Sequence, residues 1–291
     1  MFKGSIVALV TPFKGNDIDE SSLRKLVDWH ISEGTDGIVP VGTTGESPTL
    51  NHDEHERVVE IVIDQCNKRV PVIAGTGSNS TAEAINLLKH AENAGADAAL
   101  VVTPYYNKPT PEGLYAHYEA LDRASSGIPV IIYNIPSRSV IDINVDLMGR
   151  LSRLQSIVGV KDATSDISRI KKHNELCDDG FIQLSGEDET IYEYMINGGQ
   201  GCISVTANIL PKVCSDMHKA FSNNDLEEAK RLNNILMPLH KALFIETSPS
   251  PVKYILSKMN LIDYEVRLPL VKVRQETKSI LDEIVSNLEI K

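Results

Sequence analysis

The stretch "IVGVKDATSD", residues 157–166, runs from four mostly apolar residues directly into a lysine and then becomes polar. A short Val/Ile-rich run of this kind predicts a buried β-strand, with Lys161 at its end. A lysine in that place either reaches into solvent from the end of a strand or points into a cavity. The rest of the sequence has to distinguish these two possibilities.

The same pattern recurs along the whole chain. Besides residues 157–160, short Val/Ile-rich runs occupy residues 5–10, 37–41, 70–74, 98–102, 129–133, 181–184 and 202–205. Between them, apolar residues recur at the spacing of an amphipathic helix at 23–31, 58–66 and 84–91. Capping residues mark helix starts at Asn51 with Glu54, Ser80 with Glu83, and Thr110 before Pro111. We therefore expect eight strands that alternate with helices.

Strands that alternate with helices pair in parallel, because each crossover helix returns the chain in the same direction. Eight such units favour closure into a (β/α)8 TIM barrel, a fold of about 250 residues. We expect residues 1–224 to form this catalytic barrel and residues 225–291, where only helical periodicity is visible, to form a small C-terminal helical domain. Breaks in that domain are expected near its prolines: Pro238, Pro249, Pro251 and Pro269.

An open doubly wound sheet is the structural alternative to the barrel. Such a sheet would normally carry a glycine-rich dinucleotide fingerprint after its first strand, and "VTPFKGND" (10–17) contains none. The segment "GTGSNS" (75–80) lacks the GxGxxG spacing. The barrel is therefore favoured.

The composition argues against several classes of partner. Lys and Arg number 29 against 40 Asp and Glu, a net charge of −11, so nucleic acid and anionic membranes would be repelled. No apolar segment approaches the roughly 18 residues of a membrane span, and the N-terminal apolar stretch is too short for a secretion signal. The cysteines are Cys66, Cys177, Cys202 and Cys214. They show no CxxC pairing, which favours a reduced, cytoplasmic protein without a zinc site or a disulfide framework.

Chemistry in a barrel of this kind collects at the C-terminal ends of the strands. The segments in those positions are "GTTGES" (42–47), "TPYYN" (103–107), "YNIPSR" (133–138), Lys161 and "SGE" (185–187). They contain hydroxyl, phenol, guanidinium and amine groups. We therefore expect the active site at this end of the barrel.

Lys161 is the only lysine that directly terminates one of the eight runs. An amine held in a largely apolar mouth loses hydration of its charged form, and the neutral form is a nucleophile toward carbonyl groups. The structural alternative is an ion pair with Asp162 or another carboxylate. The neighbouring strand favours the catalytic interpretation, because it ends in Tyr133 and adjacent strands lie about 4.8 Å apart.

Three other groups complete a chemical pattern. The phenol of Tyr133, close to a carbonyl under attack, can transfer the protons that imine formation requires. Arg138 offers a planar fork of donors suited to a carboxylate. Thr43 and Thr44 place two hydroxyls between glycines, where they can bind an anionic group or relay protons.

Other catalytic patterns are not met. His52 and His55 stand three apart, so the HExxH zinc spacing is missing, and no GxSxG elbow occurs. The residues therefore predict a Schiff-base lyase or aldolase that acts on a small carboxylated carbonyl compound, without a metal or cofactor. They do not identify the substrate.

The segments "GTTGES" (42–47), "YYN" (105–107), "YNIPSR" (133–138), "GVKDAT" (159–164) and "ISVTAN" (203–208) resemble the motifs of the pyruvate-dependent class I aldolases, most closely the dihydrodipicolinate synthase family. The motifs agree in order and spacing, and the resemblance covers essentially the whole chain. It implies a Schiff base between Lys161 and pyruvate, whose enamine attacks the aldehyde of L-aspartate-4-semialdehyde in lysine and diaminopimelate biosynthesis. It also implies a homotetramer built as a dimer of dimers.

The resemblance implies a proton relay. Tyr133 would be the proton donor and acceptor, linked through the Thr43 hydroxyl to Tyr106. In the family, the tyrosine at the position of Tyr106 reaches in from a neighbouring subunit. The site would therefore be completed by a second copy of the chain.

The resemblance also implies substrate contacts. Thr44 would help to hold the pyruvate carboxylate, and Arg138 would take the carboxylate of the semialdehyde. Gly186 and Ile203 match positions whose backbone lines the lysine pocket.

The chain departs from the family next to Arg138. Family members usually continue from this arginine into a Thr-Gly pair, whereas this chain has Ser139 and Val140. A β-branched residue does not readily adopt the positive φ that glycine allows. We therefore expect the Arg138 loop to lie differently.

Six residues match the positions that bind L-lysine between subunits in regulated family members: Ser47, His52, His55, Asn79, Glu83 and Tyr105. Feedback inhibition by L-lysine is the implied function. Alternatively, Glu83 is only the capping partner of Ser80, and His55 is a solvated helix residue. Pro48, which replaces the commoner small residue, weighs against inhibition.

Two other functions stay open at this point. N-acetylneuraminate lyase and the 2-keto-3-deoxy-sugar-acid aldolases share the lysine and the tyrosine, but Arg138 and Tyr106 favour the semialdehyde. A barrel that binds a keto acid without turnover is the alternative from a different class. Such a protein has no need for an amine, a phenol and a hydroxyl relay together, so the enzyme is favoured.

Overall fold

The structure, a computed structural model, describes residues 2–288 and 290. Its main sheet contains eight strands in the order β4-β1-β10-β9-β8-β7-β6-β5, and the pairs within it are parallel. The strands are β1 (Gly4–Ala8), β4 (Gly37–Val39), β5 (Ile73–Gly75), β6 (Ala98–Val102), β7 (Val130–Asn134), β8 (Ile157–Asp162), β9 (Ile182–Ser185) and β10 (Gly201–Ser204). Each overlaps one of the predicted runs, so the prediction of eight strands is confirmed.

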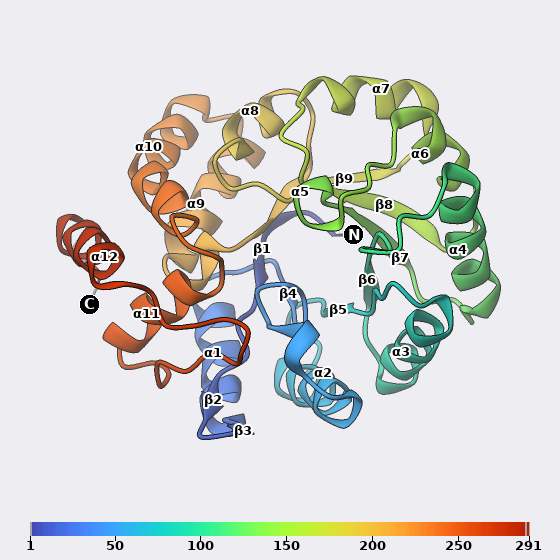
Figure 1. The fold of residues 1–291 in the computed structure, drawn as a ribbon. Coiled ribbons are helices and arrows are strands. Elements are labelled where there is room, and N and C mark those ends of the chain that lie inside the picture. The colour runs from blue at the N-terminus through green and yellow to red at the C-terminus, as the bar shows by residue number, and fades with distance from the viewer. Residues whose placement is uncertain (1, 289, 291) are drawn as a thin grey trace.

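The two edges of this sheet meet and close it into a barrel. Ile38 of β4 forms a parallel bridge with Val72, which directly precedes β5, and the Ile38 backbone N–H donates to the carbonyl oxygen of Pro71 at 3.0 Å. The Gly75 N–H donates to the Pro40 carbonyl oxygen at 3.1 Å. The helices lie around the outside of the strands (Figure 1). The predicted (β/α)8 TIM barrel is therefore confirmed.

Nine of the described α-helices lie before residue 225: α1 (Glu20–Ser32), α2 (His52–Cys66), α3 (Thr81–Ala94), α4 (Pro111–Ala124), α5 (Pro136–Ser139), α6 (Val145–Leu151), α7 (Ser168–Leu176), α8 (Ile191–Ile196) and α9 (Pro211–Ser222). The predicted caps are present. The Asn51 side chain accepts from the Glu54 N–H while the Glu54 carboxylate accepts from the Asn51 N–H. Helix α3 ends at Gly95, whose φ of 91° suits glycine.

Three α-helices are described after residue 224: α10 (Leu226–Ala242), α11 (Ser250–Lys258) and α12 (Gln275–Asn287). The last two lie outside the ring of barrel helices, on the side of α1 and α9 (Figure 1). The predicted break at Pro238 is wrong, because Pro238 lies inside α10. Proline removes only one helical hydrogen bond, and the buried side chains of Leu236 and Leu239 hold α10 in place across it. The division after residue 224 stays a prediction.

One small element was not predicted. Strands β2 (Phe13–Lys14) and β3 (Asp17–Ile18) form an antiparallel hairpin after β1. Two residues are too few to produce a recognisable alternation in the sequence. The side chain of Phe13, in this hairpin, is buried.

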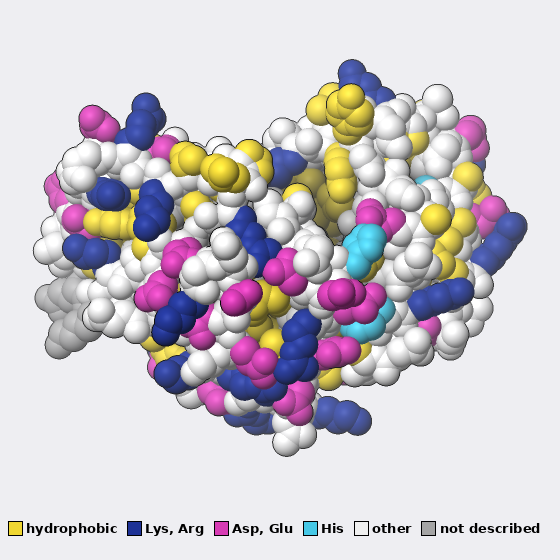
Figure 2. Space-filling model, turned by 60° about the horizontal axis from the view of Figure 1, so that its bottom comes forward, with side chains coloured by type: hydrophobic (Ala, Val, Ile, Leu, Met, Phe, Trp, Pro, Cys, Tyr) yellow, Lys and Arg dark blue, Asp and Glu magenta, His cyan; other side chains and the backbone are white. Residues whose placement is uncertain are grey.

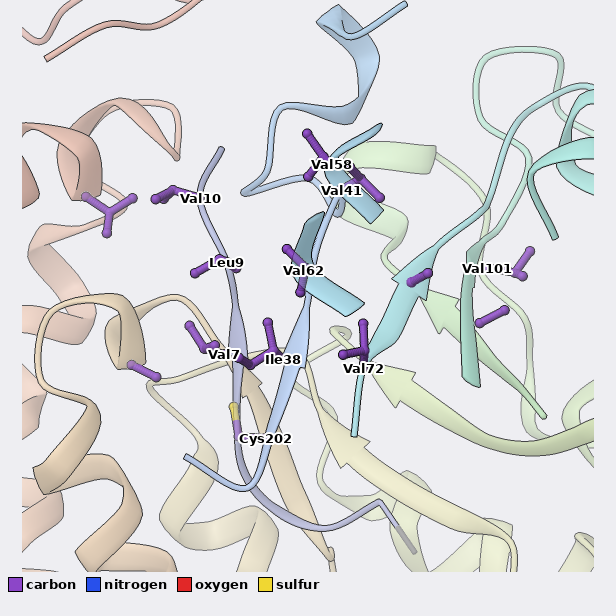
Figure 3. Packing of buried hydrophobic residues seen from close by; sticks show 14 of the residues in the cluster. Val7, Leu9, Val10, Ile38, Val41, Val58, Val62, Val72, Val101 and Cys202 are labelled. Carbon is purple, nitrogen blue, oxygen red and sulfur yellow. The ribbon is translucent and has the colours of Figure 1, made fainter. Parts of the chain in front are cut away.

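Side chains of the strands alternate between two cores, as the period of two in a β-strand requires. In β7, Ile131 and Tyr133 belong to the core inside the barrel, whereas Ile132 belongs to the layer between strands and helices. In β8, Val160 belongs to that outer layer, so its neighbour Lys161 faces the interior. Figure 3 shows part of the outer core, where side chains of α2 pack against strand residues.

Charged side chains of both signs lie on the surface of the protein (Figure 2). Basic and acidic side chains lie interspersed over the face shown in Figure 2. In the part of the chain that the structure describes, no helix is both long enough and apolar enough to span a membrane.

Candidate active site

Lys161 and Tyr133 lie side by side on neighbouring strands. They are register partners in the pairing of β7 with β8, and the Lys161 Nζ atom lies 4.0 Å from the centre of the Tyr133 ring. Each residue is only 6% exposed. Among the described residues, no carboxylate forms an ion pair with Lys161. The amine therefore lies in a largely apolar interior, beside a phenol.

Asp162, the alternative partner for Lys161, is bound elsewhere. Its side chain points away from the barrel interior and forms an ion pair with Arg169 of α7 at 3.0 Å. Its second oxygen accepts hydrogen bonds from the backbone N–H and the hydroxyl of Thr164. Because adjacent strand residues face opposite sides, Asp162 does not neutralise the amine of Lys161.

The "GTTGES" segment forms a tight loop between β4 and the short 3₁₀ helix Ser47–Thr49. The Glu46 N–H donates to the Thr43 carbonyl oxygen at 3.1 Å, and the Thr11 hydroxyl donates to the Gly45 carbonyl oxygen at 2.7 Å. Thr44 is buried, and Thr43 is partly exposed. The loop thus presents two hydroxyls at the C-terminal end of the barrel.

A cavity of about 580 Å³ opens at this end of the barrel. Thr43, Tyr133 and Arg138 line it together, so the structure brings these three predicted residues to one site. Lys161 does not line the cavity but contacts Tyr133, which does. Thr44 is likewise not part of the cavity wall.

The Arg138 loop differs from our expectation. Val140 adopts a φ of 65°, in the left-handed region, and ends the short helix α5. The expectation that a valine would not adopt a positive φ here is therefore wrong. The Ser139 hydroxyl explains how the turn is held, because it donates to the carbonyl oxygens of both Ile135 and Ile141. Arg138 is exposed at the cavity mouth.

Gly186 directly follows β9 and lies beside the lysine, and Ile203 lies on β10. A Cβ atom at Gly186 would come within 3.1 Å of the Lys161 Cε atom. Ile203 is buried and belongs to the same interior core as Tyr133. Both positions therefore shape the space around the Lys161 and Tyr133 side chains.

Tyr106 is placed differently from the other site residues. Its side chain is 88% exposed, its φ is 72°, and it does not line the cavity. In a single copy of the chain, Tyr106 therefore lies on the surface, outside the cavity.

Most of the residues matched to L-lysine binding lie on the same cavity. Ser47, His52, His55, Glu83 and Tyr105 line it, whereas Asn79 does not. His55 is buried rather than solvated. The Glu83 backbone N–H donates to the Ser80 hydroxyl, as the capping alternative requires, and the Glu83 carboxylate also contacts His52 and Ser78. L-lysine binding at these residues stays a prediction. Burial lowers the pKa of His55 to about 4.

Glu187 is a titratable residue close enough to Lys161 and Arg138 for their charges to affect its pKa, and the sequence analysis did not single it out. Burial, followed by the charge of Asp188, raises the pKa of Glu187 to about 7, although the positive charges of Lys161 and Arg138 oppose this. Its position two residues after β9, within the quoted "SGE", was the available signal. No group of three or more His, Cys, Asp or Glu side chains in the described residues could hold a metal ion.

Comparisons with known proteins agree with this geometry. The family model described as "Dihydrodipicolinate synthetase family" matches residues 1–288. The 4-hydroxy-tetrahydrodipicolinate synthase of Pelagibacter ubique is 58% identical over 286 residues, which cover 97% of each chain. That of Bradyrhizobium diazoefficiens is 57% identical over 277 residues, covering 95% of this chain and 93% of the relative.

A solved structure gives the same result in three dimensions. The chloride-inhibited dihydrodipicolinate synthase from Acinetobacter baumannii, complexed with pyruvate, is 48% identical and superposes with a TM-score of 0.97 over 100% of both chains. The match of the family model and the identity of these relatives over nearly their whole length leave one conclusion. The chain belongs to the dihydrodipicolinate synthetase family.

Proposed function

We propose that the protein is a 4-hydroxy-tetrahydrodipicolinate synthase that condenses pyruvate, bound as a Schiff base on Lys161, with L-aspartate-4-semialdehyde. The observation that carries the proposal is the buried Lys161 amine, without an ion pair among the described residues, 4.0 Å from the centre of the Tyr133 ring. The family and its curated relatives support the synthase over the sugar-acid lyases. A cytoplasmic location agrees with four free cysteines.

The reaction begins with attack of the neutral Lys161 amine on the keto carbon of pyruvate. The carbinolamine loses water to give the imine, and Tyr133 delivers the proton that the departing hydroxyl requires. Removal of a methyl proton gives the enamine, whose methyl-derived carbon attacks the aldehyde carbon of the semialdehyde. The amino group of the semialdehyde then attacks the imine carbon, closes the ring and releases Lys161.

Two carboxylates must be held during this sequence. Thr44 lies in the loop that carries Thr43 and is suited to the pyruvate carboxylate, which stays close to Lys161. Arg138 is exposed at the cavity mouth, where its guanidinium can bind the carboxylate of the entering semialdehyde. The absence of a side chain at Gly186 leaves room for the imine beside Lys161, and Ile203 belongs to the same interior core as Tyr133.

The proposal includes a homotetramer in which Tyr106 completes the relay from Tyr133 through Thr43 in a neighbouring copy. The exposure of Tyr106 supports it, because an 88% exposed tyrosine in a left-handed backbone conformation is available to a second chain. Sedimentation of the enzyme and of Tyr106→Ala tests this arrangement. Wild-type kcat in Tyr106→Ala would contradict it.

L-lysine inhibition is the regulatory part of the proposal. The cavity brings His52, His55 and Glu83 together near Ser47 and Tyr105, and Asn79 directly follows Ser78, whose hydroxyl donates to the Glu83 carboxylate. The Glu83 carboxylate suits an ammonium group. Inhibition by millimolar L-lysine that is lost in Glu83→Gln is the expected result, and a flat dose-response curve would remove this part.

Borohydride trapping tests the central step. Reduction in the presence of pyruvate should inactivate the enzyme and leave a pyruvate-derived adduct on the peptide that contains Lys161. A parallel assay of pyruvate with either aspartate semialdehyde or N-acetylmannosamine separates the synthase from the lyase. An unmodified Lys161 peptide in an enzyme with normal turnover would refute the mechanism.

A further inference from the structure

The loop that carries Thr43 and Thr44 is bracketed by two residues in unfavourable backbone conformations. Val41 has a φ of 48° and Glu46 a φ of 56°, both in the left-handed region. For a β-branched residue such as Val41 this conformation is a genuine outlier. Strained backbone of this kind persists only where surrounding contacts hold it, and it occurs at functional sites.

A buried contact to this loop comes from the C-terminal part of the chain. The Glu46 carboxylate forms an ion pair with Lys253 of α11, and both side chains are fully buried. Its second oxygen accepts from the backbone N–H of Arg267 at 3.0 Å. The carboxylate of Glu46 is thus held by Lys253 and Arg267, which lie 207 and 221 positions further along the sequence.

The surroundings of this pair hold both partners in place. The Lys253 Nζ atom lies 4.1 Å and the Arg267 guanidinium carbon 4.3 Å from the centre of the Phe13 ring. Arg267 also pairs with Glu54 of α2 at 2.7 Å and donates to the Thr49 carbonyl oxygen at 3.1 Å. The C-terminal segment therefore contacts the catalytic loop and the helix that follows it.

Stability alone does not explain a buried ion pair in this position. Removing two charges from water costs several kcal/mol, and well-packed apolar residues of similar volume are often as stable. Burial lowers the pKa of Lys253 to about 8, against the opposing effect of Glu46, which reflects this cost. An arrangement with such a cost is better explained by a requirement for a defined loop geometry.

We infer that Glu46 and Lys253 are positioning residues, which hold the Thr43 and Thr44 hydroxyls in the geometry that the reaction needs. The C-terminal helical segment thereby takes part in catalysis without touching the substrate. The inference rests on the proposed function, because it assigns the loop its role in that reaction. It predicts a defect in turnover that is separate from any defect in folding.

The test uses the double variant Glu46→Gln/Lys253→Met. It removes both charges together, so neither is left buried without a partner, and both replacements keep approximately the original volume. We expect a folded protein with a kcat at least tenfold below that of the parent enzyme. Borohydride trapping of pyruvate on Lys161 should continue, because Lys161 is held by β8 and not by the loop.

Two controls give the result its meaning. Lys258→Met removes another lysine of α11, one that pairs with Asp282 on the surface, and should leave kcat unchanged. The parent enzyme is first assayed with pyruvate and aspartate semialdehyde. Absence of turnover there would refute the proposed function, whereas an active parent and a folded double variant of equal kcat would refute the inference.

If the double variant does not fold, Lys253→Arg replaces it. Arginine keeps the charge near Glu46, but its planar head cannot occupy the position of the Lys253 ammonium. A folded Lys253→Arg enzyme with at least threefold lower kcat supports positioning. An unchanged kcat in that variant overturns it.

Discussion

At the scale of single residues, the site depends on whether a strand side chain points to the inside or to the outside of the barrel. Lys161 and Asp162 are adjacent in the sequence, yet one faces Tyr133 inside the barrel and the other pairs with Arg169 outside it. A shift of one residue in β8 would exchange them and place a carboxylate where the reaction needs an amine. The register of β8 on β7 is therefore as important to the chemistry as the lysine itself.

Replacement of Tyr133 by phenylalanine tests the proton transfer. The ring and its contact with Lys161 are kept, and only the hydroxyl is lost. General acid-base groups contribute about 10²- to 10⁴-fold, so we expect kcat to fall by roughly 10²-fold or more. Steady-state kinetics give the measurement, with Tyr115→Phe on α4 as the matched control. A Tyr133→Phe enzyme within threefold of the parent would exclude the role.

Replacement of Gly186 by alanine tests the space around the lysine. The added Cβ would lie 2.7 Å from the Ala163 Cβ atom and 3.1 Å from the Lys161 Cε atom, closer than ordinary contacts. We expect the lysine side chain to shift and borohydride trapping of pyruvate to slow by about tenfold, an effect of roughly 1.4 kcal/mol. Trapping at the parent rate in Gly186→Ala would contradict this expectation.

That Lys161 and Tyr133 lie side by side could be predicted, because both come at the ends of apolar runs that form neighbouring strands. Sequence reasoning failed at Val140, because propensity disfavours a positive φ there but the two hydrogen bonds of Ser139 impose it. It also missed Glu187. The raised pKa of Glu187 depends on its burial and on the charge of Asp188. The position of a glutamate in the sequence does not reveal its burial.

At the scale of elements, helix α7 is tied to the active strand by a buried arginine. Arg169 pairs with Asp162 of β8 at 3.0 Å and with Asp142 at 3.1 Å, and it donates to the Ile143 carbonyl oxygen. Asp142 in turn accepts from the Asn134 amide at the end of β7. One side chain thus joins the ends of two neighbouring strands to the segment that follows the Arg138 loop.

Arg169→Met should therefore destabilise the protein. The substitution leaves the buried Asp162 carboxylate without its cation, and breaking such a pair costs about 3 kcal/mol or more. Urea denaturation measures the loss. Arg231→Met, which removes a surface arginine paired with Glu228 on α10, is the control and should have no measurable effect. A loss in Arg169→Met no larger than in the control would contradict the argument.

The elements themselves were largely predictable, and the exceptions have physical causes. Strands and capped helices leave local patterns, so the eight strands and the starts of α2, α3 and α4 could be read from the sequence. Helix α10 continues through Pro238 because tertiary packing outweighs the local preference. The hairpin β2–β3 is too short for periodicity.

At the scale of the whole molecule, long-range pairs were beyond sequence reasoning. Nothing near Glu46 indicates a partner 207 residues away, and nothing in the helical pattern around Lys253 distinguishes a buried lysine from one on the surface. Only the closure of the barrel and the return of the C-terminal segment bring them together. The C-terminal helices were predicted as an appendage, yet one of their residues contacts the catalytic loop.

The whole molecule also contains several buried histidines that should control its stability toward acid. Burial lowers the pKa of His30 to about 3 and those of His55, His117 and His218 to about 4, from 6.5. Between pH 6.5 and 4 the unfolded chain therefore binds more protons than the folded one, so stability falls as the pH decreases through this window. Each such histidine contributes up to about 1.4 kcal/mol per pH unit.

Urea denaturation at pH 7, 6 and 5 measures the slope of the free energy of unfolding against pH. His30→Leu should reduce this slope, because it removes an imidazole that must be buried in its neutral form. Equal stability at pH 7 and 5, or an unchanged slope in His30→Leu, would show that these histidines are accessible to protons in the folded protein.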